Sequence, residues 1–199
     1  MKYSALTVAL VLSVGLGSPA SAETAKTPLR QIKACENCHG ARGDSTDPYT
    51  PRLNSQPAAY LLNRLRELTD FVKETPHATN AMFNHAHTTE HLGSQIANYF
   101  ANQIPTPAQP RPGKLADMGA QLVADGDLAD HVLACQSCHG AGAAGLGAAP
   151  RLVGQHKKYL ETQLWDLFLN LRQNSVMHPT AGKFSADQID ALTAYLGAD

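Results

Sequence analysis

Cys35-Glu-Asn-Cys-His-Gly40 recurs 100 residues later as Cys135-Gln-Ser-Cys-His-Gly140, so the same kind of six-residue motif occurs twice in a chain of 199 residues. Further matches keep the same order at offsets of 95 to 99: Pro51-Arg-Leu53 with Pro150-Arg-Leu152, Gln56 with Gln155, Tyr60-Leu61 with Tyr159-Leu160, and Met82 with Met177. Repetition in a fixed order along most of a chain is typical of a tandem duplication. The motif therefore predicts two similar units.

A proline-rich segment separates the two copies. Ile104-Pro-Thr-Pro-Ala-Gln-Pro-Arg-Pro-Gly113 has four prolines in ten residues. Proline fixes its own backbone angle and lacks an N–H group, so such a segment forms an extended, semi-rigid linker rather than a helix. The sequence predicts one domain over residues 23–103, the linker over 104–113, and a second domain over 114–199.

The amino terminus has the features of an export signal. Lys2 precedes the apolar run Leu6 to Leu16, and Ser18-Pro-Ala-Ser-Ala22 offers small residues for cleavage before Glu23. The apolar run is about half of the roughly 20 residues that span a bilayer. These features predict a signal peptide over residues 1–22, removed near Ala22, and no membrane span afterwards. An uncleaved signal that acts as an anchor is the alternative.

Charge does not select a partner for this chain. The formal net charge is −1, and removal of Lys2 with the signal brings it to about −2. No basic footprint for nucleic acid results, so we expect no nucleic-acid partner.

Both units are predicted to be all-α. Apolar residues recur at helical spacing of three and four in two corresponding segments: Tyr60, Leu61, Leu65, Leu68 and Phe71 in the first unit, and Leu160, Leu164, Leu167, Phe168 and Leu171 in the second. Ser185 and Gln188 occupy capping-box positions ahead of a final helix. The aliphatic content is small for two such domains, so a buried prosthetic group would complete each core.

The cysteine spacing identifies that group. In C-x-x-C-H, two cysteines form thioethers to haem while the adjacent histidine reaches the iron. Four cysteines in an exported chain also suggest disulfides, but this spacing favours haem. A zinc site would need a second nearby pair, and a redox dithiol would need a βαβ context. The motifs predict two covalent haem c groups, on Cys35, Cys38, Cys135 and Cys138, with His39 and His139 as iron ligands.

The position of methionines within the repeat predicts the second iron ligands. Met82 and Met177 correspond to each other, whereas Met118 precedes its own haem motif and is interpreted as a packing residue in the first helix of unit two. A histidine cluster, His77, His85, His87 and His91, surrounds Met82. These histidines are interpreted as solvated, and His85 is the first substitute if Met82 is not the ligand.

The arrangement resembles the dihaem cytochrome c4 family, whose two class I cytochrome c domains each carry the haem motif, a proline followed by a basic residue and leucine, and a distal methionine. The resemblance implies that the carbonyls of Pro51 and Pro150 accept a hydrogen bond from Nδ1 of the iron-binding histidines. It also implies that Arg52 and Arg151 contact haem propionates. Ordinary solvated arginines are the alternative.

An iron closed on both faces by histidine and methionine has no site for substrate, which favours an electron carrier over an enzyme. We expect a periplasmic carrier that takes electrons from a quinol-oxidising complex or a dehydrogenase and passes them to a terminal oxidase or reductase. Peripheral association with a membrane stays open. The first alternative is a dihaem subunit of an oxidoreductase complex such as a flavocytochrome sulfide dehydrogenase. A dihaem peroxidase, which needs an accessible iron, is the second.

Overall fold

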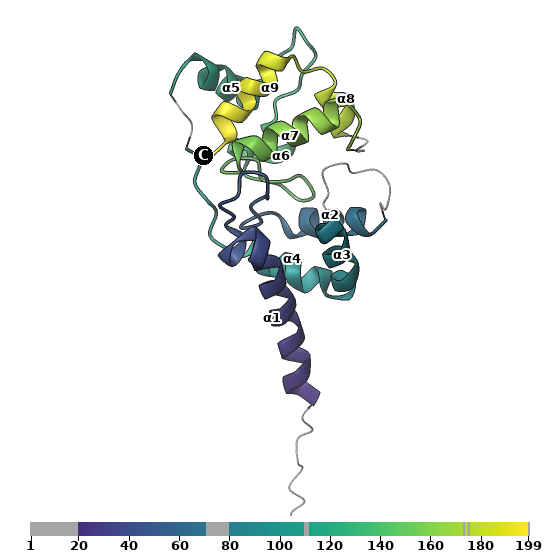
Figure 1. Ribbon diagram of the computed structural model, residues 1–199. Coiled ribbons are helices and arrows are strands. Elements are labelled where there is room, and N and C mark those ends of the chain that lie inside the picture. The colour runs from purple at the N-terminus through teal and green to yellow at the C-terminus, as the bar shows by residue number, and fades with distance from the viewer. Residues whose placement is uncertain (1–19, 71–79, 110–111, 173, 175, 199) are drawn as a thin grey trace, which may run out of the picture.

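The computed structural model describes residues 20–70, 80–109, 112–172, 174 and 176–198. Within these residues the regular elements are helices, and strand pairing is limited to isolated bridges (Figure 1). The predicted all-α class is therefore confirmed. Residues 1–19 of the predicted signal peptide lie outside the described residues, and the first helix begins at Ala20. No helix in the described ranges combines the length and apolar character needed to cross a membrane.

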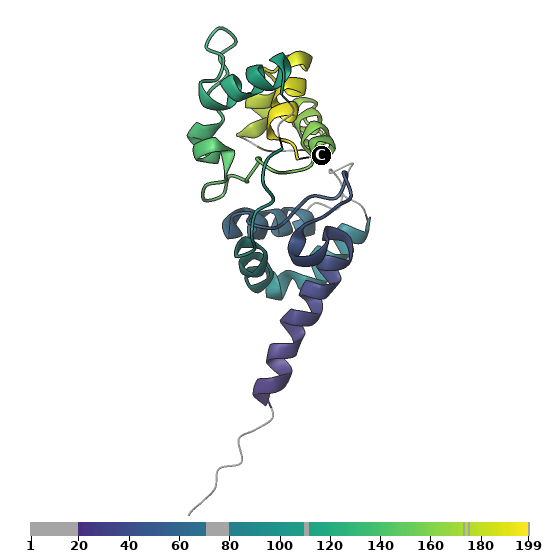
Figure 2. The same ribbon diagram turned by 90° about the vertical axis from the view of Figure 1, so that its left-hand side faces the viewer.

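The first domain is the group of helices around the first motif. Its elements in chain order are α1 (Ala20–His39), η1 (Ala41–Gly43), α2 (Ala58–Asp70), α3 (Asn80–Thr89), η2 (Glu90–Leu92) and α4 (Gly93–Ala101). Ile32 of α1, Leu61 of α2, and Ile96 and Phe100 of α4 form its apolar core. The amino-terminal part of α1 projects from the body of the molecule (Figures 1 and 2). Helix α1 therefore packs against the first domain at its carboxyl end, where the first C-x-x-C-H motif lies.

The second domain is the corresponding group around the second motif. Its elements are α5 (Lys114–Ala124), α6 (Gln136–His139), η3 (Ala141–Ala143), α7 (Lys157–Phe168), α8 (Met177–Ala181) and α9 (Ala186–Leu196). Val132, Leu167, Ile189 and Leu192 are buried in its core. Helices α5 and α9 cross so closely that a Cβ added to Gly119 would lie 2.1 Å from the carbonyl oxygen of Ala191. Glycine is required at this crossing.

Two sequence predictions about the second domain have different outcomes. The capping box is confirmed, because the Ser185 hydroxyl accepts from the Gln188 N–H and the Gln188 side chain accepts from the Ser185 N–H. The prediction that Leu171 belongs to the apolar stripe is wrong. Helix α7 ends at Phe168, Asn170 turns the chain with a φ of 55°, and Leu171 is 41% exposed. The corresponding Phe71 lies outside the described residues.

Reciprocal hydrogen bonds join the two domains. The Gln56 side chain accepts from the Arg151 N–H at 2.9 Å and donates to the Arg151 carbonyl at 2.8 Å. The Gln155 side chain accepts from the Arg52 N–H at 2.8 Å and donates to the Arg52 carbonyl at 3.0 Å. Each domain thus offers one glutamine to the backbone of the other. Figure 2 shows the two helical groups stacked with the connecting chain running beside them.

The predicted linker packs against this junction. The Thr106 hydroxyl donates to Asp44 at 2.7 Å and accepts from the Asn54 amide at 2.9 Å. The linker is therefore not a loose tether over residues 104–109, because Thr106 contacts both domains. A buried contact between Nε2 of His156 and the Ser45 carbonyl, at 2.9 Å, adds a further bond between the domains.

Candidate haem-binding sites

The first candidate iron ligand is fixed by a proline carbonyl. His39 ends α1, is 7% exposed, and has Nδ1 2.8 Å from the carbonyl oxygen of Pro51. A carbonyl only accepts, so Nδ1 carries the hydrogen and Nε2 keeps a lone pair for a metal. Burial lowers the pKa of His39, the Pro51 carbonyl opposes this, and the nearby His85 lowers it further. The imidazole is therefore kept neutral, as iron coordination requires.

The second domain repeats this arrangement. His139 is 5% exposed, and its Nδ1 lies 2.8 Å from the carbonyl oxygen of Pro150. Burial lowers its pKa in the same way, against the opposing effect of the carbonyl. The two proline contacts implied by the family resemblance are both present.

A glycine follows each iron-binding histidine and reverses the chain, so that the proline carbonyl of the loop reaches the histidine Nδ1. Gly40 and Gly140 both have a φ of +77°, a conformation that disfavours any side chain. At Gly40 an added Cβ would also lie 2.3 Å from the Asp44 carbonyl oxygen. The glycine of the C-x-x-C-H-G motif is therefore structural: it reverses the chain directly after the ligand.

The first cysteine of each motif lies in an environment that disfavours the thiolate. Burial raises the pKa of Cys35 and of Cys135 to about 11. A thiol that resists ionisation is a poor zinc ligand and a poor redox nucleophile. Among the described residues, no group of three or more histidine, cysteine or carboxylate side chains is placed to share a metal ion. The donor set fits haem c.

A cavity in the first domain adjoins these groups. The empty space here, counted out into open solvent, is about 1290 Å³, and Cys35, Cys38 and His39 line it. Most of the remaining lining from this domain is apolar, namely Leu53, Leu61, Leu65, Leu68, Ile96, Ala97 and Phe100. Helix α3 adds Met82 and His85. A large, mostly apolar group would fit this cavity, where His39 offers a nitrogen donor and Met82 a sulfur donor.

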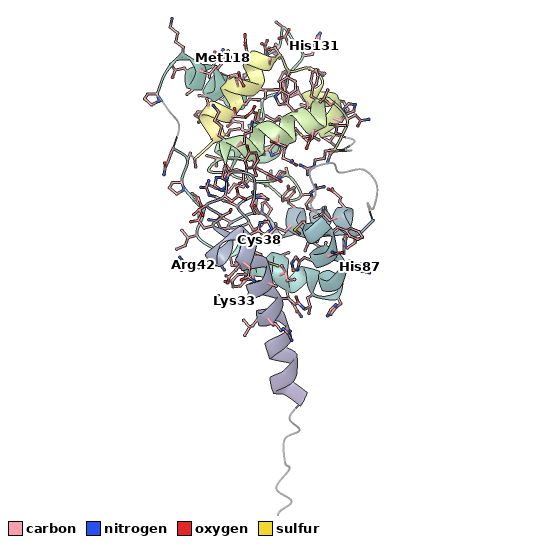
Figure 3. All side chains as sticks on the ribbon, viewed as in Figure 1. Lys33, Cys38, Arg42, His87, Met118 and His131 are labelled. Carbon is pink, nitrogen blue, oxygen red and sulfur yellow. The ribbon has the colours of Figure 1, made fainter. Side chains whose placement is uncertain are left out.

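Helix α3 therefore offers two donors to one cavity. His85 is the member of the histidine cluster that lines it, whereas His87 is exposed and stacks on the Phe83 ring with centroids 6.3 Å apart. His87 points outward at the edge of the first domain in Figure 3. His91 is exposed, and His77 lies outside the described residues. Of the described histidines in the cluster, His85 is the one that lines the cavity with Met82.

In the second domain Met177 is half-buried at the start of α8 and packs against the apolar core. Its neighbour His178 is bound elsewhere, with Nδ1 2.7 Å from the Leu167 carbonyl oxygen. Met118 packs against the same core from α5, far from Cys38 in Figure 3. Met177 as the donor and Met118 as a packing residue stay predictions.

The two arginines of the repeat lie at the domain junction. Arg52 donates from Nη1 to the Gly154 carbonyl at 3.0 Å, and its Nε lies 3.3 Å from Asp44 without hydrogen-bond alignment. Arg151 donates from Nη2 to the Thr106 carbonyl at 3.4 Å. Their contact with haem propionates stays a prediction. The arginines that line the first cavity are instead Arg64 and Arg172, which the repeat did not single out.

With this geometry in place, similarity to known proteins decides the family. A cytochrome c4 of Pseudomonas aeruginosa is 31% identical over 198 residues, which are 96% of each chain. The chain belongs to the cytochrome c4 family. The solved cytochrome c4 of Acidithiobacillus ferrooxidans has a TM-score of 0.76 at 28% identity, covering 83% of this chain and 99% of that one.

Two further similarities are more specific. Residues 127–196 match the family model described as cytochrome c oxidase, cbb3-type, subunit III. A thiosulfate dehydrogenase electron acceptor of Thiomonas intermedia is 30% identical over 176 residues, which are 84% of this chain and 79% of that protein. As a cytochrome c4, the chain is an electron-transfer protein with two covalent haem c groups on two class I cytochrome c domains. The predicted family, fold, cofactors and electron transfer are confirmed.

Proposed function

We propose that this cytochrome c4 is a periplasmic electron carrier with His39 and Met82 on one iron and His139 and Met177 on the other. The four cysteines of the motifs would hold the haems as thioethers. The observation that carries the proposal is the equal pair of contacts, 2.8 Å from each histidine Nδ1 to its proline carbonyl. The same preset tautomer at both sites supports a histidine ligand on each iron.

A haem with two protein ligands exchanges one electron without an open position for substrate. The chain's own residues then set how readily this happens. Burial of His39 and His139 and the apolar cavity wall disfavour the extra charge of ferric iron, and thioether donation is weak and neutral. Both effects raise the reduction potential, which suits delivery to an oxidase.

The boundaries and the compartment belong to the same proposal. Residues 1–22 would be removed on export to the periplasm, leaving domains over 23–103 and 114–199. Cleavage near Ala22 would trim only the first residues of α1, far from the core contact of Ile32. The proposed donor is a quinol-oxidising complex or a dehydrogenase, and the proposed acceptor is a terminal oxidase or reductase.

A second candidate is an acceptor or subunit dedicated to one dehydrogenase. The relative named thiosulfate dehydrogenase electron acceptor favours it, and a flavocytochrome sulfide dehydrogenase is another complex of this kind. Purification from the native host distinguishes the candidates. A carrier is recovered alone and stable, whereas stoichiometric copurification with a dehydrogenase, and instability without it, would favour the dedicated role.

The ligand proposal is tested by a redox titration followed by optical and paramagnetic resonance spectra. We expect two one-electron components, each with a histidine–methionine signature, and no rapid carbon monoxide binding by the reduced native protein. A bis-histidine signal from one haem would remove Met82 from its site. Rapid carbon monoxide binding would instead favour the peroxidase alternative.

A further inference from the structure

The cavity of the first domain is completed by the second domain. Four residues of the second domain line it: Tyr159, Gln163, Asp166 and Arg172. The haem of the first domain would therefore contact both halves of the chain. The charges that the second domain places on this wall act on the first haem.

Arg172 is the unusual member of that wall. It is 9% exposed, donates from Nη1 to Oε1 of Gln163 at 2.9 Å, and hydrogen-bonds with the Tyr60 side chain. Its Nε is buried without a hydrogen-bond partner. No carboxylate among the described residues forms an ion pair with it, whereas the other arginine of the cavity, Arg64, is paired with Glu67 at 2.8 Å.

Carboxylates already lie near this charge: the Glu67 carboxylate helps to raise the pKa of Arg172, and Asp166 lies on the same cavity wall. Burial and the hydrogen-bonded Tyr60 raise the pKa of Tyr159 to about 12, so this phenol stays neutral at physiological pH. The Oδ2 of Asp166 accepts from the Gln163 amide at 3.5 Å, and the Oε1 of the same glutamine accepts from Arg172. A buried N–H group without an acceptor is unfavourable, and the Nε of Arg172 is such a group on the cavity wall. The wall therefore lacks an acceptor beside Arg172, and haem carries two carboxylates that can supply one.

We infer that Arg172 of the second domain binds a carboxylate of the haem in the first domain and raises the reduction potential of that haem. The inference uses the established haem and rests on the proposed function only for the ligand set. Ferric haem carries one more positive charge than ferrous haem, so a cation held nearby favours the reduced state. Contact with the second domain would thus raise the reduction potential of the first haem.

The test is a potentiometric titration of the full chain with both haems in three forms: wild type, Arg172→Gln and Arg172→Lys. In Arg172→Gln we expect the equilibrium constant for reduction of one haem to fall about tenfold, or about 59 mV for one electron, with the other haem unchanged. Contacts between haem methyl groups and Ile96 in nuclear magnetic resonance spectra assign the shifted haem to the first domain. Arg172→Lys keeps the charge and should keep the potential within about threefold of wild type.

Arg42→Gln is the matched control, because Arg42 is exposed (Figure 3) and does not line the cavity. It should leave both potentials unchanged. Two unchanged potentials in folded Arg172→Gln would overturn the inference, as would equal shifts in the Gln and Lys variants. If the Gln variant fails to fold, the Lys variant still decides, since loss of the forked contact must alter the haem carboxylate bands in resonance Raman spectra. The wild-type titration separately tests the proposed function.

Discussion

The Tyr99 hydroxyl donates a hydrogen bond of 2.8 Å to Oε1 of Glu36, joining α4 to the helix that carries the first haem motif. The same oxygen accepts from the Arg42 N–H at 2.8 Å, and Lys33 pairs with the other oxygen at 2.7 Å. Burial acts to raise the pKa of Glu36, but these three partners outweigh it and lower the pKa. The charged carboxylate of Glu36, which lies between Cys35 and Cys38 in the sequence, thus joins α1 to α4 and to the loop after the motif.

Removal of the Tyr99 hydroxyl should weaken this link between α1 and α4. Tyr99→Phe is expected to lower the free energy of unfolding of the first domain by about 2 kcal/mol, because the lost hydrogen bond is to a charged group. Urea unfolding at neutral pH, followed by the haem absorbance, measures the change. Tyr195→Phe is the matched control, since no side-chain hydrogen bond of Tyr195 is present in the described structure, and a drop of equal size there would contradict the prediction.

The same carboxylate predicts a pH dependence. Its pKa is lower in the folded chain than the usual 4.5, so it stabilises the fold above that value and the contribution is lost as pH falls through the folded pKa. The difference in unfolding free energy between wild type and Glu36→Gln should therefore be largest at neutral pH and shrink in acid. A difference that grows as the pH falls would show that the carboxylate is not held charged.

Met82 and His85 of α3 predict different spectra of the first haem when each residue is replaced. His85→Ala should leave the methionine-type ferric absorption band intact. Met82→Ala should lose the band from one haem and lower its potential as His85 replaces the thioether. The double variant should bind carbon monoxide when reduced. Loss of the band in His85→Ala alone would make His85 the native ligand.

Much of the fold was predictable from local sequence, because caps, linkers and stripes are set by near neighbours. The Ser185 and Gln188 cap is an example. The stripe that included Leu171 failed because spacing cannot reveal where Asn170 turns the chain. Arg172 was missed for another reason: its partners lie in the other domain, and repetition within a sequence does not say that two copies face each other.

The domain junction predicts equal effects from the two glutamines that occupy equivalent positions of the repeat. Gln56→Ala and Gln155→Ala should each leave the N–H and carbonyl of one arginine without their partner, at a cost of about 1–3 kcal/mol. Either change should speed protease cleavage within residues 104–113. Exposed Gln121→Ala should have no such effect, and an unchanged cleavage rate in both interface variants would mean that other contacts hold the domains together.

The crossing of α5 and α9 predicts sensitivity to a single methyl group. Gly119→Ala should lower the unfolding free energy of the second domain by about 1–3 kcal/mol, since the added Cβ has no room beside Ala191. Gly182→Ala is the control, because its added Cβ would lie 3.4 Å from the nearest atom. Comparable losses in both variants, measured by thermal unfolding, would count against a tight crossing.

The reciprocal glutamine contacts make the junction isologous, with one patch on each half facing its own duplicate. Each unit therefore contacts its twin through the same surface, so a second copy of the unit needs no separate contact surface. Once joined, the halves were free to diverge. The loop after the first motif carries Arg42, Asp44 and Asp47, whereas its twin, residues 141–149, consists of glycine, alanine and one leucine. The two loops that meet the opposite domain at the junction thus differ in charge.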